Sequence, residues 1–292
     1  NIKTDGNIVL KGVSGYSNTL KKSAGIFLDQ FNLSAKNAKF IGRHASSNEA
    51  LEGKRLDGIF VIDSIIDVQE HLAVDGIPAE NKKIKDSIGV FTLNSAFAAD
   101  TMEIRGIAAE YFEFESERLA LNSILSPYQQ PEQVIGKNIG LLLRESTFLT
   151  RNGDLEVSGV GGLGAKNLHG VWLDQSTKLT ANNGSLNING VAGSLGSEMY
   201  GVVVEGSHLI SDKNIKMLAK SSEGLSANDN IGIKLSDNSS VSAENIILNG
   251  EGGFVHQEGK SLDGVSIDQT QLSAENKIKI AGTAGRGAFI SR

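Results

Sequence analysis

The sequence predicts an all-β fold, a parallel β-helix in which coils of roughly 31 residues stack into a rod. Three observations support this prediction. One glycine-led pattern recurs eight times along the 292 residues, and apolar residues alternate with polar ones within each copy. The composition combines 34 Gly with only 3 Pro and 5% aromatic residues. Such a chain suits many short strands around a thin aliphatic interior better than a thick aromatic core.

The repeat consists of a glycine and three short alternating segments that end near another glycine. The clearest copy spans residues 170–190, GVWLDQSTKLTANNGSLNING. Successive starting glycines are 30 to 33 residues apart, except for an interval of 51 after the third copy. A constant period of this length is typical of stacked repeats. The copies begin at Gly25, Gly58, Gly89, Gly140, Gly170, Gly201, Gly232 and Gly264.

Alternation at period two predicts that each copy forms three strands with one buried face. In the clearest copy the alternating pairs are Val171 and Leu173, Leu179 and Ala181, and Leu186 and Ile188. Three short strands cannot bury such a face alone, but they can when coils stack. Each strand then pairs with its equivalent about 4.8 Å away in the next coil. We expect Leu and Ile inside, with Asn and Gly at corners that need left-handed or tight backbone.

Two other repeat architectures fit the sequence less well. A leucine-rich horseshoe needs its Leu-x-x-Leu-x-Leu-x-x-Asn signature, which the repeats lack. A propeller blade needs four strands and about 40 residues or more. The interval in this chain is too short for such a blade.

The domain prediction is one β-helix segment over residues 1–292, with the most regular coils in residues 140–292. The opening residues 7–12 resemble a third strand without its first half, and residues 287–292 resemble a first strand that does not finish. Solenoids carry polar caps at their ends. We therefore expect a segment of a longer protein.

A long insertion at residues 107–139 interrupts the repeat and is the first candidate binding site. Residues 42–58 form a second, milder excess in a segment that joins two coils. Such joins occur at the same corner of successive coils, so we expect both to lie on one lateral face, about two coils apart. The insertion could contain a short helix or an edge strand. The predicted receptor-binding residues are Tyr111, Phe112, Phe114 and Tyr128 in the insertion, with Arg43, His44, Lys54 and Arg55 in the shorter join.

The sequence does not support a metal site, a nucleic-acid interface, a membrane span or a dinucleotide-binding site. The chain has no Cys, and its five His show no metal-ligand spacing. A formal charge of −6 with mixed signs gives no nucleic-acid footprint, and no apolar run approaches the length of a membrane span. Gly159, Gly161 and Gly164 match G-x-G-x-x-G but precede a strand, so we expect no cofactor there.

Carboxylates recur at the end of the first strand, where we expect one solvated outward column and no catalytic residues. They follow the starting glycine by four residues or by five. The first group is Asp29, Asp174, Glu205 and Asp268, and the second is Asp63, Glu145 and Asp237.

Repeats such as GVWLDQSTKLTANNGSLNING and GVSIDQTQLSAENKIKIAG (residues 264–282) resemble those of filamentous-haemagglutinin-type exoproteins. These are large proteins exported by two-partner secretion, among them haemagglutinin adhesins and effectors of contact-dependent growth inhibition. The resemblance covers nearly the whole chain and is best over residues 140–282. It implies a right-handed β-helix, a secreted or bacterial cell-surface location, and an outer-membrane transporter as partner of the full-length protein.

Two functions from different classes follow. The first is a binding module that recognises a protein or glycan receptor on another cell. The second is a passive spacer of an adhesin filament. A polysaccharide-acting enzyme is a third possibility that the residues favour less. The insertion favours the first, because a spacer gains nothing from an excursion that carries Pro127, Pro131 and four aromatic residues.

Overall fold

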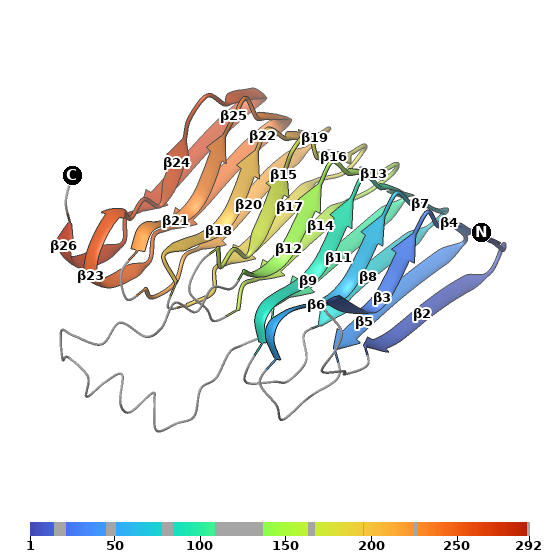
Figure 1. The fold of residues 1–292 in the computed structure, drawn as a ribbon. Helices are drawn as coiled ribbons and strands as arrows, with labels where there is room; N and C mark the ends of the chain where they lie inside the picture. Colours follow the sequence, from blue (N-terminus) through green and yellow to red (C-terminus); the bar gives the residue numbers. More distant parts are fainter. Residues whose placement is uncertain are drawn as a thin grey trace.

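The fold is a parallel β-helix, which confirms the predicted fold class. The computed structural model describes residues 1–14, 22–44, 51–77, 84–108, 137–162, 167–194, 196–224 and 227–290. Every strand pairing in this part of the chain is parallel and joins residues about one repeat apart, except across the insertion. Figure 1 shows the coils stacked side by side, with the two termini at opposite ends of the stack.

The coils have three faces, and the first strand of each repeat forms face 1. The strands of face 1 are hydrogen-bonded in one sheet, so that Val171 pairs with Val202 and Val202 with Ile233. Face 1 consists of β3 (Lys22–Asp29), β6 (Leu51–Ile62), β9 (Ile84–Leu93), β12 (Asn138–Arg144), β15 (Val171–Asp174), β18 (Glu198–Glu205), β21 (Ala227–Ser236) and β24 (Val265–Ile267).

The second and third strands of each repeat form face 2 and face 3. Face 2 consists of β1 (Ile2–Lys3), β4 (Asn32–Ala35), β7 (Ile65–Val68), β10 (Ala96–Ala99), β13 (Thr147–Thr150), β16 (Lys178–Ala181) and β19 (His208–Ser211). Face 3 consists of β2 (Asn7–Ser14), β5 (Asn37–His44), β8 (His71–Ile77), β11 (Thr101–Ile107), β14 (Leu155–Val160), β17 (Leu186–Val191) and β20 (Asn214–Lys220). The long strands β22 (Ser240–Glu251) and β25 (Gln271–Thr283) continue from face 2 into face 3. Near the C-terminal end, β23 (Phe254–Ser261) pairs with β21 and β26 (Arg286–Ile290).

The interior consists of columns of equivalent apolar residues, as the alternation predicts. On face 2 one column runs through Leu33, Ile66, Phe97, Phe148, Leu179, Leu209 and Val241, all of which are at most 2% exposed. The rings of Phe97 and Phe148 stack with centroids 4.6 Å apart. The columns of the three faces pack together in one core cluster.

The turn from face 1 to face 2 uses left-handed backbone, on Asn as expected at Asn94 and Asn238, but more often on residues that we did not expect there. The residues with positive φ here are mostly Gln, Asp, Asn and Glu, and Gly206 is the one glycine with positive φ in the described residues. One residue later, after Asp63, Asn94 and Glu145, buried hydroxyls bridge successive coils. The amide of Ser64 donates to Oγ of Ser95 (3.2 Å), and the amide of Ser95 donates to Oγ of Ser146 (3.3 Å). These bonds satisfy backbone groups that the turn leaves buried.

The recurring glycines serve mainly for close approach where face 3 meets face 1 of the next coil. A Cβ on Gly159 would lie 2.0 Å from the carbonyl oxygen of Gly170, and a Cβ on Gly190 would lie 2.0 Å from that of Gly201. No side chain fits at either contact. All but one of these joins thus begin and end at two glycines in contact, the exception beginning at Ala219, so the length of a join can change without disturbing the coils.

Candidate binding face

The predicted receptor-binding residues lie largely outside the described part of the chain. Arg43 is exposed at the end of β5, where it pairs in register with Ile77 of β8. The backbone of His44 belongs to β5, and that of Lys54 and Arg55 belongs to β6, but the description does not extend to these three side chains. Tyr111, Phe112, Phe114 and Tyr128 also lie outside the described residues. The predicted site therefore stays a prediction.

The ends of the two long joins do lie at one corner, as predicted. Gly42 and Gly106 both pair with Gly76, so the joins that follow them leave face 3 in the same column, two coils apart. They re-enter face 1 in β6 and β12, the strands that carry Gly58 and Gly140. The insertion therefore enters and leaves the rod beside the edge of face 1.

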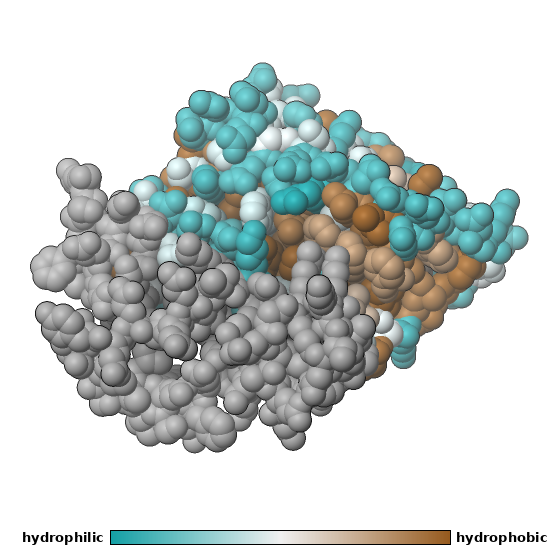
Figure 2. All heavy atoms as spheres, viewed as in Figure 1, coloured by the Kyte–Doolittle hydropathy of each residue, from teal (hydrophilic) through white to brown (hydrophobic). Residues whose placement is uncertain are grey.

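The outer surface of face 1 carries a column of apolar and aromatic residues that we call the outer column. It is formed by the second residue after each starting glycine, whose side chain points away from the interior. The column runs through Phe27, Phe60, Phe91, Leu142, Trp172, Val203, Lys234 and Ser266. Figure 2 shows hydrophobic residues gathered on this side, where Figure 1 places β3, β6 and β9.

The other two faces present columns of mostly polar residues to solvent. An outward column of face 3 runs through Lys39, Ala73, Glu103, Glu156, Asn187 and Lys216. An outward column of face 2 runs through Ile65, Ala96, Thr147, Lys178, His208 and Ser240. Apolar residues also lie outside on the other two faces, among them Ile65 on face 2 and Val13, Val160 and Val191 on face 3. Among the described residues, however, only face 1 stacks aromatic rings on its outer side. The outer column is therefore not a requirement of the β-helix fold.

The outer column begins with three stacked phenylalanines. The ring centroids of Phe27 and Phe60 are 5.2 Å apart, and those of Phe60 and Phe91 are 4.9 Å apart. Phe27 is 58% exposed, whereas Phe60 and Phe91 pack in one cluster with Ile88, Ile139 and Leu142. Aromatic pairs at such distances are favourable beyond the area they bury. The stack thus forms a rigid apolar ridge along the N-terminal half of face 1.

Beyond Leu142 the face becomes amphipathic. The guanidinium of Arg144 donates from Nε (2.8 Å) and contacts from Nη2 (2.6 Å) the same carboxylate oxygen of Asp174. The indole Nε1 of Trp172 donates to Glu205 at 2.9 Å, and Lys234 lies 3.4 Å from the same carboxylate. The face thus combines apolar side chains with charged groups that pair between adjacent coils.

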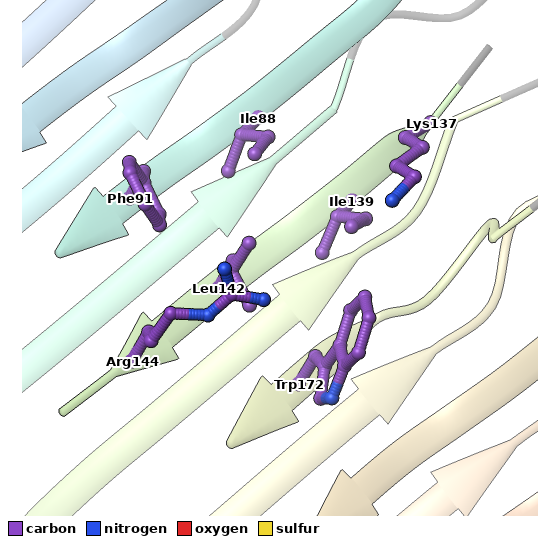
Figure 3. A pocket seen from close by; sticks show the side chains of 7 residues that line it. All are labelled: Ile88, Phe91, Lys137, Ile139, Leu142, Arg144 and Trp172. Atoms are coloured by element: carbon purple, nitrogen blue, oxygen red, sulfur yellow. The ribbon is translucent and has the colours of Figure 1, made fainter. Parts of the chain in front are cut away.

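A hollow of about 180 Å³ opens on this face between the phenylalanine ridge and Trp172. Figure 3 shows the lining side chains projecting from three neighbouring strands. Phe91 and Trp172 lie on opposite sides, with the shorter Leu142 between them in the outer column. The hollow is lined by Ile88, Phe91, Lys137, Ile139, Leu142, Arg144 and Trp172.

No family model, curated protein or solved structure matches this chain. The resemblance to filamentous-haemagglutinin-type exoproteins therefore remains a prediction from the repeats. The fold and the outer surface of face 1 are the observations on which a functional proposal can rest.

The sequence contains a signal for the outer column that our prediction did not use. When the copies are aligned on their starting glycines, the second position after glycine reads Phe, Phe, Phe, Leu, Trp, Val, Lys, Ser. The alternation assigns this position to the outside, so its apolar character in six successive copies marks an unusual surface. We placed the predicted binding site in the insertion instead, because the insertion is the largest departure from the repeat.

His169 is a buried titratable group beside face 1. It is 2% exposed, its ring stacks on Tyr200 at 4.8 Å, and it meets Trp172 edge-on at 5.0 Å. Its Nδ1 has no hydrogen-bond partner among the described residues. Burial lowers the pKa of His169 to about 3, and the nearby charges of Lys234 and Lys137 act in the same direction. His169 is therefore neutral in the folded protein at ordinary pH.

We expect His169 to make the folded protein less stable as the pH falls. The unfolded chain takes up a proton on His169 near its ordinary pKa of 6.5, whereas the folded protein does so only near 3. The contribution of neutral His169 to the free energy of unfolding is complete above pH 6.5. It is lost as the pH falls toward 3, by at most about 1.4 kcal/mol per pH unit. The His169→Phe variant keeps the ring packing but has no group that titrates. Between pH 7 and pH 4.5 its free energy of unfolding, measured by urea unfolding, should fall by about 2 kcal/mol less than that of the parent protein. Identical losses in both proteins would contradict this account.

Tyr200 is also perturbed, although it does not titrate in the accessible range. Burial raises the pKa of the Tyr200 phenol well above its ordinary value, and its hydrogen bond to Asp229 adds to the effect. The phenol donates to a carboxylate oxygen of Asp229 at 2.8 Å, and the ammonium of Lys234 lies 5.2 Å from the ring centroid. The ring is thus fixed as part of the wall beside Trp172.

The carboxylates at the end of the first strand form two columns, so the prediction of one was wrong. Asp29 and Asp174 occupy the last strand position, in register with Ile62 and Arg144. Asp63 and Glu145 come one residue later, in the left-handed turn. The turn changes the direction of successive side chains, which a count of residues cannot show.

Neither metal ligation nor membrane insertion gains support from the part of the chain that the structure describes. No group of three or more His, Asp or Glu there could hold a metal ion. No helix within the described ranges has the length and apolar content that a membrane span needs.

Proposed function

We propose that this chain is a recognition module of a large bacterial exoprotein, secreted or held at the cell surface. It binds a protein or glycan receptor on another cell through the outer surface of face 1 and the joins beside it. The observation that carries the proposal is the aromatic stack of the outer column, which adds a ridge of rings outside the rod on face 1, where the fold does not need one.

The physical argument rests on what such a surface does in water. Phe27 is 58% exposed at the open end of the stack, whereas Phe60 and Phe91 are 7% and 6% exposed. An exposed aromatic ring that continues a rigid apolar cluster is a natural contact for a partner. Aromatic side chains on rigid elements supply most of the energy at protein interfaces. A passive spacer, the alternative, would be served by polar columns on all three faces. Action on a polysaccharide is the third alternative. Our proposal assigns the chain no catalytic reaction.

The test compares two equally exposed apolar residues on different faces. Phe27 on face 1 is 58% exposed and Val9 in β2 on face 3 is 56% exposed. We expect Phe27→Ser to weaken saturable binding of the labelled protein to bacterial cells about tenfold, as for an interface hot spot. Val9→Ser should leave binding unchanged, because it removes a similar apolar surface from a polar face.

Flow cytometry on a panel of bacterial cells provides the measurement. Pretreatment of the cells with protease or with glycosidase distinguishes a protein receptor from a glycan. Absence of saturable binding to any cell would favour the spacer. Equal loss in both variants would contradict the assignment of face 1, because the two substitutions differ chiefly in position.

A further inference from the structure

Face 3 has a shallow trough on its outer side near the N-terminal end of the rod, across β2, β5, β8 and β11. An outward column runs here through Val9, Lys39, Ala73 and Glu103, and Ala73 is its smallest side chain. Lys39 and Glu103 thus lie two coils apart, about 9–10 Å, with only a methyl group between them. The trough measures about 340 Å³, which is within the usual size of a small-ligand pocket. Its lining includes Asn7, Val9, Lys39, His71, Ala73 and Glu103.

The trough is open to solvent, and polar groups on its rim are available to a ligand. Lys39 and Glu103 are both exposed, and neither forms an ion pair with another described residue. The side-chain oxygen of Asn7 and Nδ1 of His71 are already engaged in hydrogen bonds, which leaves the amide nitrogen of Asn7 and Nε2 of His71. The rim can therefore donate and accept hydrogen bonds around an apolar floor. A few such polar groups around apolar side chains are typical of a site that orients a small ligand.

Face 3 is also the cationic side of an acidic chain. With β22 counted from Asn245 and β25 from Lys277, its strands hold eight Lys and Arg against four Asp and Glu, a net charge of +4 in a chain of formal charge −6. The cations are Lys11, Lys39, Arg43, Arg105, Lys216, Lys220, Lys277 and Lys279, and the carboxylates are Asp75, Glu103, Glu156 and Glu251. Lys11, Lys39 and Arg43 lie in β2 and β5 at the trough, and none has an ion-pair partner in the described part of the chain. Such a group of cations attracts anionic ligands and strengthens their hydrogen bonds.

We propose that the trough on face 3 binds one or two residues of an acidic polysaccharide, whose sugars carry carboxylate groups. This site is separate from the outer column of face 1 and goes beyond the proposed function. A carboxylate of the ligand lies toward Lys39 and Lys11. The sugar hydroxyls donate to Glu103 and accept from Asn7, while the C–H groups of the ring rest on Ala73. The flat face of the rod lets the rest of the polysaccharide extend to either side.

Two histidines of similar environment allow the site to be tested by NMR. His71 lines the trough, and His208 lies exposed on face 2; in each, Nδ1 contacts one hydroxyl group. The probe is trigalacturonate, and its methyl ester is the uncharged control. We expect a saturable shift of the His71 ring resonances with the acid but none for His208, and an affinity for the ester at least about fivefold weaker, since the ester lacks the charge-assisted contact. Equal affinities would overturn the acidic character of the ligand, and an unmoved His71 would overturn the site.

Three variants locate the contact. Ala73→Leu fills the trough from an outward position, so we expect the melting temperature to stay near that of the parent and the affinity for trigalacturonate to fall at least about tenfold. Lys39→Gln should weaken binding about fivefold. Lys178→Gln makes the same change of charge at an exposed position of face 2 and should leave the affinity unchanged. Undiminished binding in Ala73→Leu, or equal weakening by the two Lys variants, would overturn the proposal.

The titration uses no cells, so this proposal and the proposed function can fail separately. Val9→Ser removes none of the polar groups of the trough, so its comparison with Phe27→Ser on cells keeps its meaning whatever the titration shows. Inorganic triphosphate serves as an anion without a sugar. If it shifts the His71 resonances as tightly as trigalacturonate does, the trough binds anions in general and the assignment to a polysaccharide falls.

Discussion

Replacing Phe148 with alanine should lower the free energy of unfolding by about 4 kcal/mol, the largest effect that we expect of one interior substitution. The side chain is 1% exposed and stacks on Phe97 with the rings nearly parallel, at 6°. Its coil is hydrogen-bonded to the coils on both sides, through Ala98 and Thr180 on face 2. Those bonds keep the surrounding backbone from collapsing into the cavity.

Equilibrium urea unfolding followed by far-ultraviolet circular dichroism measures this effect. Phe27→Ala is the matched control, because it removes the same atoms from a ring that is 58% exposed. We expect the control to cost about 1 kcal/mol or less. Similar losses at both positions would mean that Phe148 does not lie inside the rod.

Replacing Gly190 with valine should cost about 3 kcal/mol or more, by overpacking rather than by a cavity. A Cβ there would lie 2.0 Å from the carbonyl oxygen of Gly201, and the atoms it meets are backbone atoms that cannot rotate away. Face 3 would have to separate from face 1 of the next coil. That separation would break the contact that closes the join between them.

Gly282 provides the control, since it occupies the same column in the last coil. A Cβ on Gly282 would lie no closer than 3.3 Å to its nearest neighbour, the amide nitrogen of Val265. We expect Gly282→Val to cost less than about 1 kcal/mol in the same urea unfolding experiment. Comparable losses for the two variants would refute the close-approach role. Ala219 shows that the column admits one methyl group where the sequence provides it.

The repeat and the alternation were sufficient to predict the coil, its three strands and its register. A residue such as Leu179 can pack only if its equivalents in the neighbouring coils superpose on it, so one period fixes all the ladders. The roles of the corner residues could not be predicted in the same way. Gln30 and Glu145 have little preference for positive φ and adopt it because the ladders on either side hold the turn.

The glycines show a second limit of sequence reasoning. Their frequency suggested tight turns, but Gly159 and Gly190 are required by the distance between two strands of different coils. That distance depends on how face 3 crosses face 1 and is not visible in the local sequence. The same holds for the hollow, whose rim joins Arg144 to Asp174 across 30 residues of chain.

The central claim is that the outer surface of face 1 is the binding surface. Its most direct test compares the affinity for bacterial cells of the Phe27→Ser variant with that of the Val9→Ser variant. The account predicts about tenfold weaker binding for the first and parental binding for the second. A ratio near one, with both variants folded, would contradict it.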